Sequence, residues 1–128
     1  MRLLLDTNIL LWAADDMLPG TAEKYVLDES NQLYFSSASI WEVVIKNGLN
    51  RPDFKADPHL LHSALLENGY IQIPISSEHT LLTGTLPMIH KDPFDRIIVA
   101  QSITEGISLL TTDDIIAKYP APVILMKK

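Results

Sequence analysis

Cysteine is absent from this chain of 128 residues, which excludes disulfide bonds and thiolate metal sites. Long apolar runs are also absent, since none approaches the ~18 residues that a membrane-spanning helix needs. The first apolar run ends at Asp6, which is far too early for a signal peptide. We therefore expect a cytoplasmic protein without a membrane partner.

Basic residues are scarce as well. Lys and Arg number 10 against 16 Asp and Glu, which gives a net charge of −6, and a nucleic-acid partner normally leaves a basic footprint on a protein. Five acids belong to the motifs described below, and without them 10 basic and 11 acidic residues remain, a net charge of −1. A metal ion bound by those five would reverse the local sign. The total charge is therefore not decisive about a nucleic-acid substrate.

Apolar residues make up 47% of the chain, and the length suits a single domain, residues 1–128. Short apolar runs alternate with segments of helical periodicity. We predict strands at residues 2–5, 33–36, 70–73, 107–110 and 123–125. Helices are predicted at 9–14, 21–29, 39–48, 58–67, 76–83, 93–105 and 114–119. This alternation predicts a three-layer α/β/α fold with a central, mostly parallel sheet.

The stretch from Ile89 to Arg96, with the sequence IHKDPFDR, is the most informative in the chain. Proline lacks a backbone N–H and suits the first position of a helix, so Pro93 predicts a helix that is capped by Asp92. Asp95 then lies in the first turn, where the helix dipole favours negative charge. The helix is expected to continue until Gly106 ends it.

Four acids are expected to meet at one edge of the sheet. Asp6 and Asp113 each follow a predicted strand, and Glu42 and Asp95 are each expected in the first turn of a helix. Ligands of parallel sheets bind outside the carboxyl ends of the strands, where the strand order reverses. Four carboxylates there would repel one another unless a cation held them. An all-oxygen ligand set favours Mg²⁺ or Mn²⁺, which can activate water for phosphoryl displacement in a nuclease or a phosphatase.

Four pieces of the chain carry a resemblance to a known family. They are Leu5-Asp6-Thr7-Asn8, then Ser39-Ile40-Trp41-Glu42 with Lys46 and Gly48, then His90 to Arg96 with Ala100-Gln101, and Leu110-Thr111-Thr112-Asp113. In this order and spacing they resemble PIN-domain proteins, specifically VapC-type toxins of bacterial type II toxin–antitoxin pairs, over essentially the whole chain. The resemblance implies an endoribonuclease that depends on Mg²⁺ or Mn²⁺, is held inactive by a cognate antitoxin, and is usually a homodimer. The family's four acidic positions match Asp6, Glu42, Asp95 and Asp113.

Several neighbouring residues have competing roles. Asp92 matches a carboxylate common in this branch of the family, so it is either a fifth ligand or a helix cap, and the cap is favoured. Asp6 could likewise cap a helix, and Glu42 could complete a capping box with Ser39. Thr7 and Asn8 are expected to orient Asp6 through hydrogen bonds. Weaker candidates for a phosphate or RNA contact are Lys46, Arg51, Lys91 and Arg96. None of the four histidines is assigned to catalysis, and Trp12 and Trp41 are expected in the core.

Two other classes share parts of this pattern. A phosphatase that forms a phosphoaspartate normally has a second Asp two residues after the first, where this chain has Asn8. A receiver-like signalling module has its phosphoacceptor after the third strand, where this chain has Ile73-Pro74-Ile75-Ser76. A protein that only binds a partner would not need four acids. The four acids together favour the metal-dependent ribonuclease.

Overall fold

A computed structural model of the chain describes residues 1–50 and 56–127. Its five strands form one sheet in the order β3-β2-β1-β4-β5, and every pairing in it is parallel. The strands are β1 (Arg2–Leu5), β2 (Gln32–Ser36), β3 (Ile71–Ile73), β4 (Ser108–Thr111) and β5 (Val123–Leu125). The predicted α/β fold with a central parallel sheet is confirmed.

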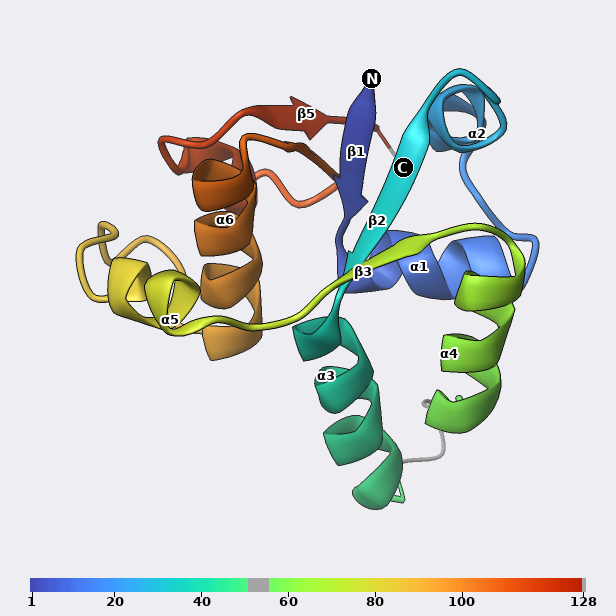
Figure 1. The fold of residues 1–128 in the computed structure, drawn as a ribbon, viewed down its shortest axis with the longest axis horizontal. Helices are drawn as coiled ribbons and strands as arrows, with labels where there is room; N and C mark the ends of the chain where they lie inside the picture. Colours follow the sequence, from blue (N-terminus) through green and yellow to red (C-terminus); the bar gives the residue numbers. More distant parts are fainter. Residues whose placement is uncertain (51–55, 128) are drawn as a thin grey trace.

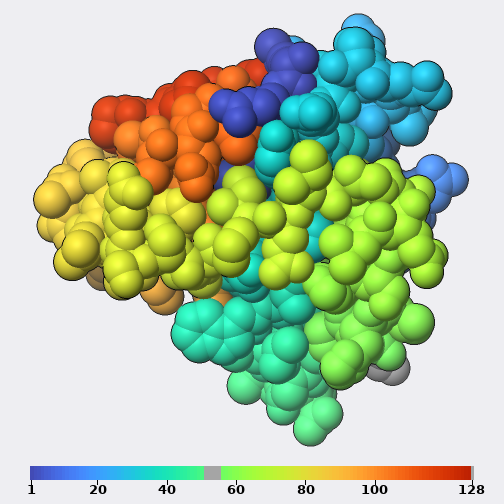
Figure 2. Space-filling view, in the orientation of Figure 1, coloured from blue at the N-terminus to red at the C-terminus, as the bar shows by residue number. Residues whose placement is uncertain are grey.

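Helices cover both faces of the sheet (Figure 1). They are α1 (Thr7–Ala14), α2 (Gly20–Val26), α3 (Ser37–Gly48), α4 (Pro58–Glu67), α5 (Ser77–Thr83) and α6 (Pro93–Glu105), with one 3-10 turn, η1 (Ile116–Lys118). Figure 2 shows α4, β3 and α5 as a continuous band across one side of the molecule, with α3 projecting below it. None of the described helices is long and apolar enough to cross a membrane.

Two apolar clusters make up the core, one on each face of the sheet. Successive residues of a strand point to opposite faces, so Leu3 and Leu5 of β1 join the cluster that contains Ile9 of α1 and Leu61 of α4. Leu4 joins the other cluster, which includes residues of α6 such as Ile98. A strand that is buried on both faces has a continuous apolar sequence, and this explains the run of leucines in β1.

Helix boundaries differ from the prediction where polar residues start a helix. Helix α1 begins at Thr7, two residues earlier than predicted, because Asp6 caps it. Helix α3 begins at Ser37, because the side chain of Ser36 accepts a hydrogen bond from the backbone N–H of Ala38. Helix α2 ends at Val26 instead of residue 29, and the helix predicted at 114–119 shortens to η1. The starts of α4 and α6, each an Asp followed by Pro, are confirmed.

The strand order determines at which edge of the sheet the predicted acids can meet. The chain moves from β1 to β2 and β3 on one side and later adds β4 and β5 on the other, so the order reverses between β1 and β4. Helix α6 leads back to β4 and runs opposite to the strands, so its first turn lies near the carboxyl ends of β1 and β4 (Figure 1). This topology brings Asp95 to the same edge as Asp6.

Candidate metal centre

Asp6 lies at the end of β1, at the point where the strand order reverses, and its side chain is 4% exposed. Its Oδ1 caps α1 by accepting the Ile9 N–H at 2.9 Å, and its Oδ2 accepts a hydrogen bond from the Thr111 hydroxyl. The expected helix cap is therefore present. It occupies one oxygen of a carboxylate that also belongs to the acidic cluster.

Thr111, the last residue of β4, connects two of the acids. While its hydroxyl donates to Asp6, the same oxygen accepts the backbone N–H of Asp113 at 3.0 Å. Asp113 in turn uses Oδ1 to accept the Ile115 N–H at 2.8 Å, and its other oxygen, Oδ2, faces the site. The hydroxyl thus fixes the positions of the first and fourth acids relative to each other.

Glu42 lies in the second turn of α3, not in the first turn as predicted, because α3 begins at Ser37. The capping box with Ser39 is therefore wrong. Glu42 is 4% exposed; its Oε1 accepts a hydrogen bond from Thr7 Oγ1 at 2.7 Å, and its Oε2 forms an ion pair with Lys46 Nζ at 2.7 Å. Each oxygen of Glu42 thus has a partner, the hydroxyl of Thr7 for Oε1 and the ammonium group of Lys46 for Oε2.

The remaining polar neighbours of Asp6 behave differently from the prediction. Thr7 does not orient Asp6, since its hydroxyl contacts Glu42 and lies 2.9 Å from Ser39 Oγ. Asn8 is exposed, and within the described part of the chain no hydrogen bond of its side chain to Asp6 is present. Thr7 therefore supports the second acid of the cluster, and among the described residues Asn8 makes no hydrogen bond to the first.

Asp92 and Asp95 both lie at the start of α6. Asp92 is its N-cap, with Oδ1 accepting the Phe94 N–H at 2.8 Å, and Asp95 is in the first turn. The cap reading of Asp92 is confirmed as geometry, and its negative charge is close enough to affect Asp95. Asp95 does not cap the helix, because Asp92 does, and it interacts with the other acids.

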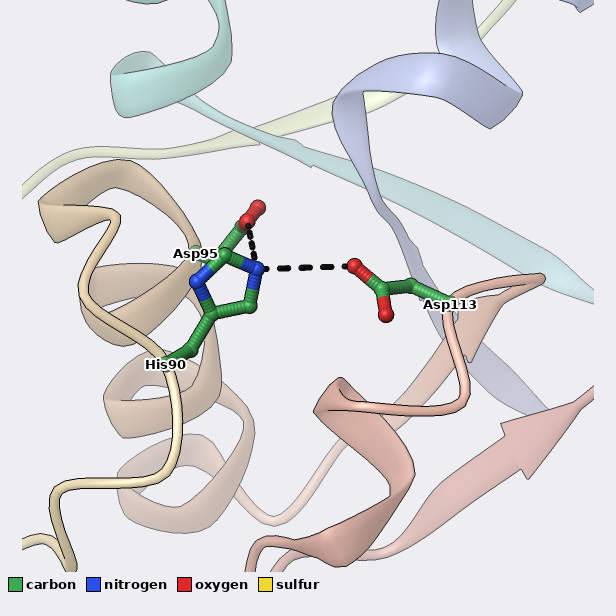
Figure 3. A group of neighbouring side chains, drawn as sticks. All are labelled: His90, Asp95 and Asp113. Atoms are coloured by element: carbon green, nitrogen blue, oxygen red, sulfur yellow. Dashed lines mark ion pairs between the residues drawn. The ribbon is translucent and has the colours of Figure 1, made fainter.

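His90 lies between two of the acids (Figure 3). Its Nε2 is 3.0 Å from Asp95 Oδ2 and 3.6 Å from Asp113 Oδ2. The ring is only partly exposed, as are both carboxylates. The sequence assigned no histidine to catalysis, and the structure adds His90 to the residues that surround the acids.

Two of the acids, Asp6 and Asp95, have raised pKa values, and the charges of neighbouring acids contribute to both shifts. The pKa of the Asp6 carboxyl is raised to about 6, mainly by burial and in smaller part by the charges of Asp113 and Glu42, while the hydrogen bonds from Thr111 and Ile9 oppose the shift. Burial also raises the pKa of Asp95 to about 7, and repulsion by four carboxylates adds to it, those of Asp92, Glu42, Asp6 and Asp113. The structure therefore brings all four predicted acids together. Their donor set fits a hard divalent cation, because it offers oxygen ligands and excess negative charge.

The four basic candidates differ in what their side chains do. Arg96 donates to the carbonyls of Thr83 and Pro87 at 2.6 and 3.0 Å and to Tyr119 Oη at 3.2 Å, so its guanidinium holds a loop in place of the expected phosphate. Lys46 pairs with Glu42, as an i,i+4 pair would. Lys91 is exposed beside Asp92. Arg51 lies outside the described residues.

Trp41 is not a core residue, since its side chain is 57% exposed. Its ring meets Phe94 edge to face, with centroids 5.2 Å apart, and both line an apolar groove of about 290 Å³. Trp12, in contrast, packs against the core as predicted. Exposed Trp41 and partly buried Phe94 thus form an aromatic pair, and each precedes one of the acids, Glu42 and Asp95, in the sequence.

Three residues of the site were missed, and their sequence signals differ. Ser39 precedes Glu42 by three residues, a spacing that places both on one helix face. Thr111 precedes Asp113 by two residues, and its signal was its position at the end of a predicted strand. His90 had no periodic signal, because a loop brings its ring to Asp95.

The sequence and fold were compared with those of known proteins. Residues 3–122 match the PIN domain family. No curated protein matches the chain. Among solved structures, VapBC2 from Rickettsia felis bound to a promoter DNA fragment has a similar chain, with a TM-score of 0.71 and 20% identity over 99% of this chain and 98% of that one. A toxin–antitoxin complex from Klebsiella pneumoniae gives a TM-score of 0.68 at 19% identity, covering 98% of each chain. DNA-bound VapBC from Salmonella typhimurium gives 0.67 at 14% identity, over 99% of this chain and 98% of that chain.

At these identities the solved structures establish a shared fold. The family match covers nearly all of the chain, and its two ends enclose all four acids and His90. The chain belongs to the PIN domain family.

Proposed function

We propose that this protein is a metal-dependent endoribonuclease and the toxin of a VapBC-type toxin–antitoxin pair. One observation carries the proposal: four carboxylates from separate elements meet where the strand order reverses, and the pKa values of Asp6 and Asp95 rise to about 6 and about 7. Such a concentration of negative charge is destabilising by itself. A group of four carboxylates in so small a domain therefore favours a site that binds a cation.

Mg²⁺ or Mn²⁺ suits these ligands best, because the four side chains offer only carboxylate oxygens. Asp6, Glu42, Asp95 and Asp113 would hold the ion, while Asp92 is used as a helix cap. When bound, a divalent ion lowers the pKa of a water molecule and neutralises charge on a phosphodiester in displacement.

The chain's own residues hold these ligands in place. Thr111 ties Asp6 to Asp113, and Thr7 and Lys46 hold the two oxygens of Glu42. Exposed Lys91, next to Asp92, offers a cation to the RNA backbone at the rim. Arg96 is excluded from this role by its three bonds to the protein.

A protein partner is proposed on two grounds. The similar solved chains come from VapBC and toxin–antitoxin complexes. In addition, large apolar side chains lie exposed on α3, at its C-cap and on α4, namely Trp41, Val44, Ile45, Leu49 and Leu60. Clustered exposed apolar residues favour a docking surface. We propose that the partners are a cognate antitoxin and a second copy of this chain, and that the pair acts in the cytoplasm.

The test is cleavage of single-stranded RNA by the purified protein, with Mg²⁺, with Mn²⁺ and with a chelator. Wild type should cleave only with a metal, and Asp95→Asn should not cleave. Since water is the proposed nucleophile, the products should carry no cyclic phosphate, which attack by the ribose hydroxyl would leave. Undiminished cleavage after exhaustive removal of metal would refute the mechanism. Hydrolysis of a phosphate monoester without RNA cleavage would favour the phosphatase instead.

A further inference from the structure

Both ring nitrogens of His90 have a defined neighbour. Nδ1 accepts the backbone N–H of Asp92 at 3.1 Å. Nε2 lies on the opposite side of the ring, 3.0 Å from Asp95 and 3.6 Å from Asp113 (Figure 3). The ring therefore bridges the start of α6 and the acids of the site.

The contact with Asp92 fixes the proton on this ring. A backbone N–H can only donate, so Nδ1 must offer its lone pair and carries no proton. In a neutral imidazole the proton then resides on Nε2. A protonated Nε2 has no lone pair for a metal ion, although His90, Asp95 and Asp113 are close enough to form a three-ligand group, with atoms within 4.8 Å.

The backbone of His90 is held as firmly as its ring. The buried Tyr119 accepts the His90 N–H at 2.7 Å and contacts the His90 carbonyl at 3.3 Å. Arg96 donates to the same Tyr119 oxygen and to the carbonyls of Thr83 and Pro87. Tyr119 and Arg96, neither of which is a proposed metal ligand, thus anchor the loop before α6.

We propose that His90 is a positioning residue and not a metal ligand. The backbone N–H of Asp92 keeps the ring as the neutral Nε2–H tautomer. The Nε2–H group then lies between the carboxylates of Asp95 and Asp113 and holds them in place. The proposal rests on the proposed function only in taking these carboxylates as ligands of an ion. The N–H places the positive end of a dipole between two negative groups. It thereby reduces their repulsion without occupying the ion's coordination sites.

Two substitutions separate the two nitrogens. The amide of Asn reaches the place of Nδ1, so His90→Asn keeps an acceptor for the Asp92 N–H and loses the group facing the acids. The amide of Gln reaches the place of Nε2, so His90→Gln keeps a donor there. Residues that orient metal ligands typically contribute about 10- to 100-fold to affinity or activity. We expect His90→Asn to lose that much Mn²⁺ affinity and RNA cleavage, and His90→Gln to stay within a few-fold of wild type.

A third variant acts from a distance. Tyr119→Phe removes the oxygen that holds the His90 backbone and that also accepts a hydrogen bond from Arg96, and it should lower Mn²⁺ affinity less than His90→Asn does. In the double variant the two losses should not add, because both act through the position of one ring. His59→Asn, an exposed histidine on α4, serves as the control and should change nothing.

The decisive measurement needs no variant. Nitrogen NMR of the wild type should show a protonated Nε2 and an unprotonated Nδ1 on His90, both without metal and with saturating Mg²⁺. Mn²⁺ affinity is measured by calorimetry, and thermal unfolding confirms that each variant is folded. A proton on Nδ1 in the metal-free protein overturns the proposal, as does loss of the Nε2 proton on addition of Mg²⁺, which would make His90 a ligand. Equal Mn²⁺ affinity in wild type and His90→Asn overturns it too. Absence of RNA cleavage by the wild type would refute the ribonuclease alone, because the tautomer and the affinities are measured without RNA.

Discussion

Replacing Asp95 by Asn should abolish RNA cleavage and, without metal, make the protein more stable. Burial raises the pKa of this carboxyl from 3.8 to about 7, with further repulsion from the nearby carboxylates. One pKa unit corresponds to about 1.4 kcal/mol, so the ionised side chain costs the fold about 4 kcal/mol at most above pH 7. Asp95 is partly exposed, and solvent screening reduces this cost. We expect Asp95→Asn to raise the free energy of unfolding by about 2 kcal/mol.

The sign of this effect depends on pH. Between about pH 4 and pH 7 the folded state binds more protons at Asp95 than the unfolded state does, so wild-type stability falls as pH rises through this range. Asn carries no charge and lacks this fall. The advantage of the variant should therefore be absent below about pH 4 and complete above about pH 7.

Urea unfolding at both ends of this range, with a chelator present, measures the effect. Asp57→Asn is the matched control, because Asp57 caps α4 ahead of Pro58 as Asp92 caps α6, but outside the acidic site. Its stability should stay close to that of wild type at both pH values, since Asn caps a helix about as well as Asp. If Asp95→Asn were no more stable than wild type above pH 7, the reasoning from burial and repulsion would be refuted.

Three further changes test other parts of the site. Glu42→Gln keeps an acceptor for Thr7 and loses the ion pair with the partly exposed Lys46, so the free energy of unfolding without metal should change by less than about 1 kcal/mol, while RNA cleavage falls by orders of magnitude. Near-normal cleavage would remove Glu42 from the ligands. Asp92→Asn should cleave RNA within a few-fold of wild type, and a loss as deep as that of Asp95→Asn would make Asp92 a ligand. Added Mn²⁺ should raise the melting temperature more above pH 7 than at pH 5, since protons compete for Asp6 and Asp95; equal shifts at both pH values would contradict metal binding by these carboxyls.

Strands and helix starts were predictable where a local rule determined them. The leucines of β1 are buried on both faces, and this burial demands an unbroken apolar run. Pro93 fixed the start of α6, because it can neither donate nor adopt another φ angle at that position. The start of α3 was misplaced because Ser36 and Ser39 are both good caps, and only the end of β2 decides which of them is used.

The candidate site was predictable as a set of acids but not as a set of contacts. Asp6 and Asp113 follow strands, so the sheet topology brings them to one edge. Thr7 lies next to Asp6 in sequence and was expected to serve it. Its hydroxyl instead reaches Glu42, 35 residues away, because residues next to each other at a helix start point in different directions. The contact of His90 with Asp95 depends on a loop conformation for which the sequence has no periodic pattern.

Three of the four acids lie beside a backbone N–H donor or at the start of a helix. Asp6 caps α1, Asp95 is in the first turn of α6, and Asp113 accepts the Ile115 N–H; such N–H groups are unpaired within a helix and attract negative charge. Glu42 is beyond the first turn of α3, and Lys46 supplies the positive charge that the helix does not. These partners hold each acid in place, yet the pKa values of Asp6 and Asp95 remain raised. The fold therefore holds the acids in place while repulsion persists at Asp6 and Asp95, and the proposed divalent ion would relieve this repulsion.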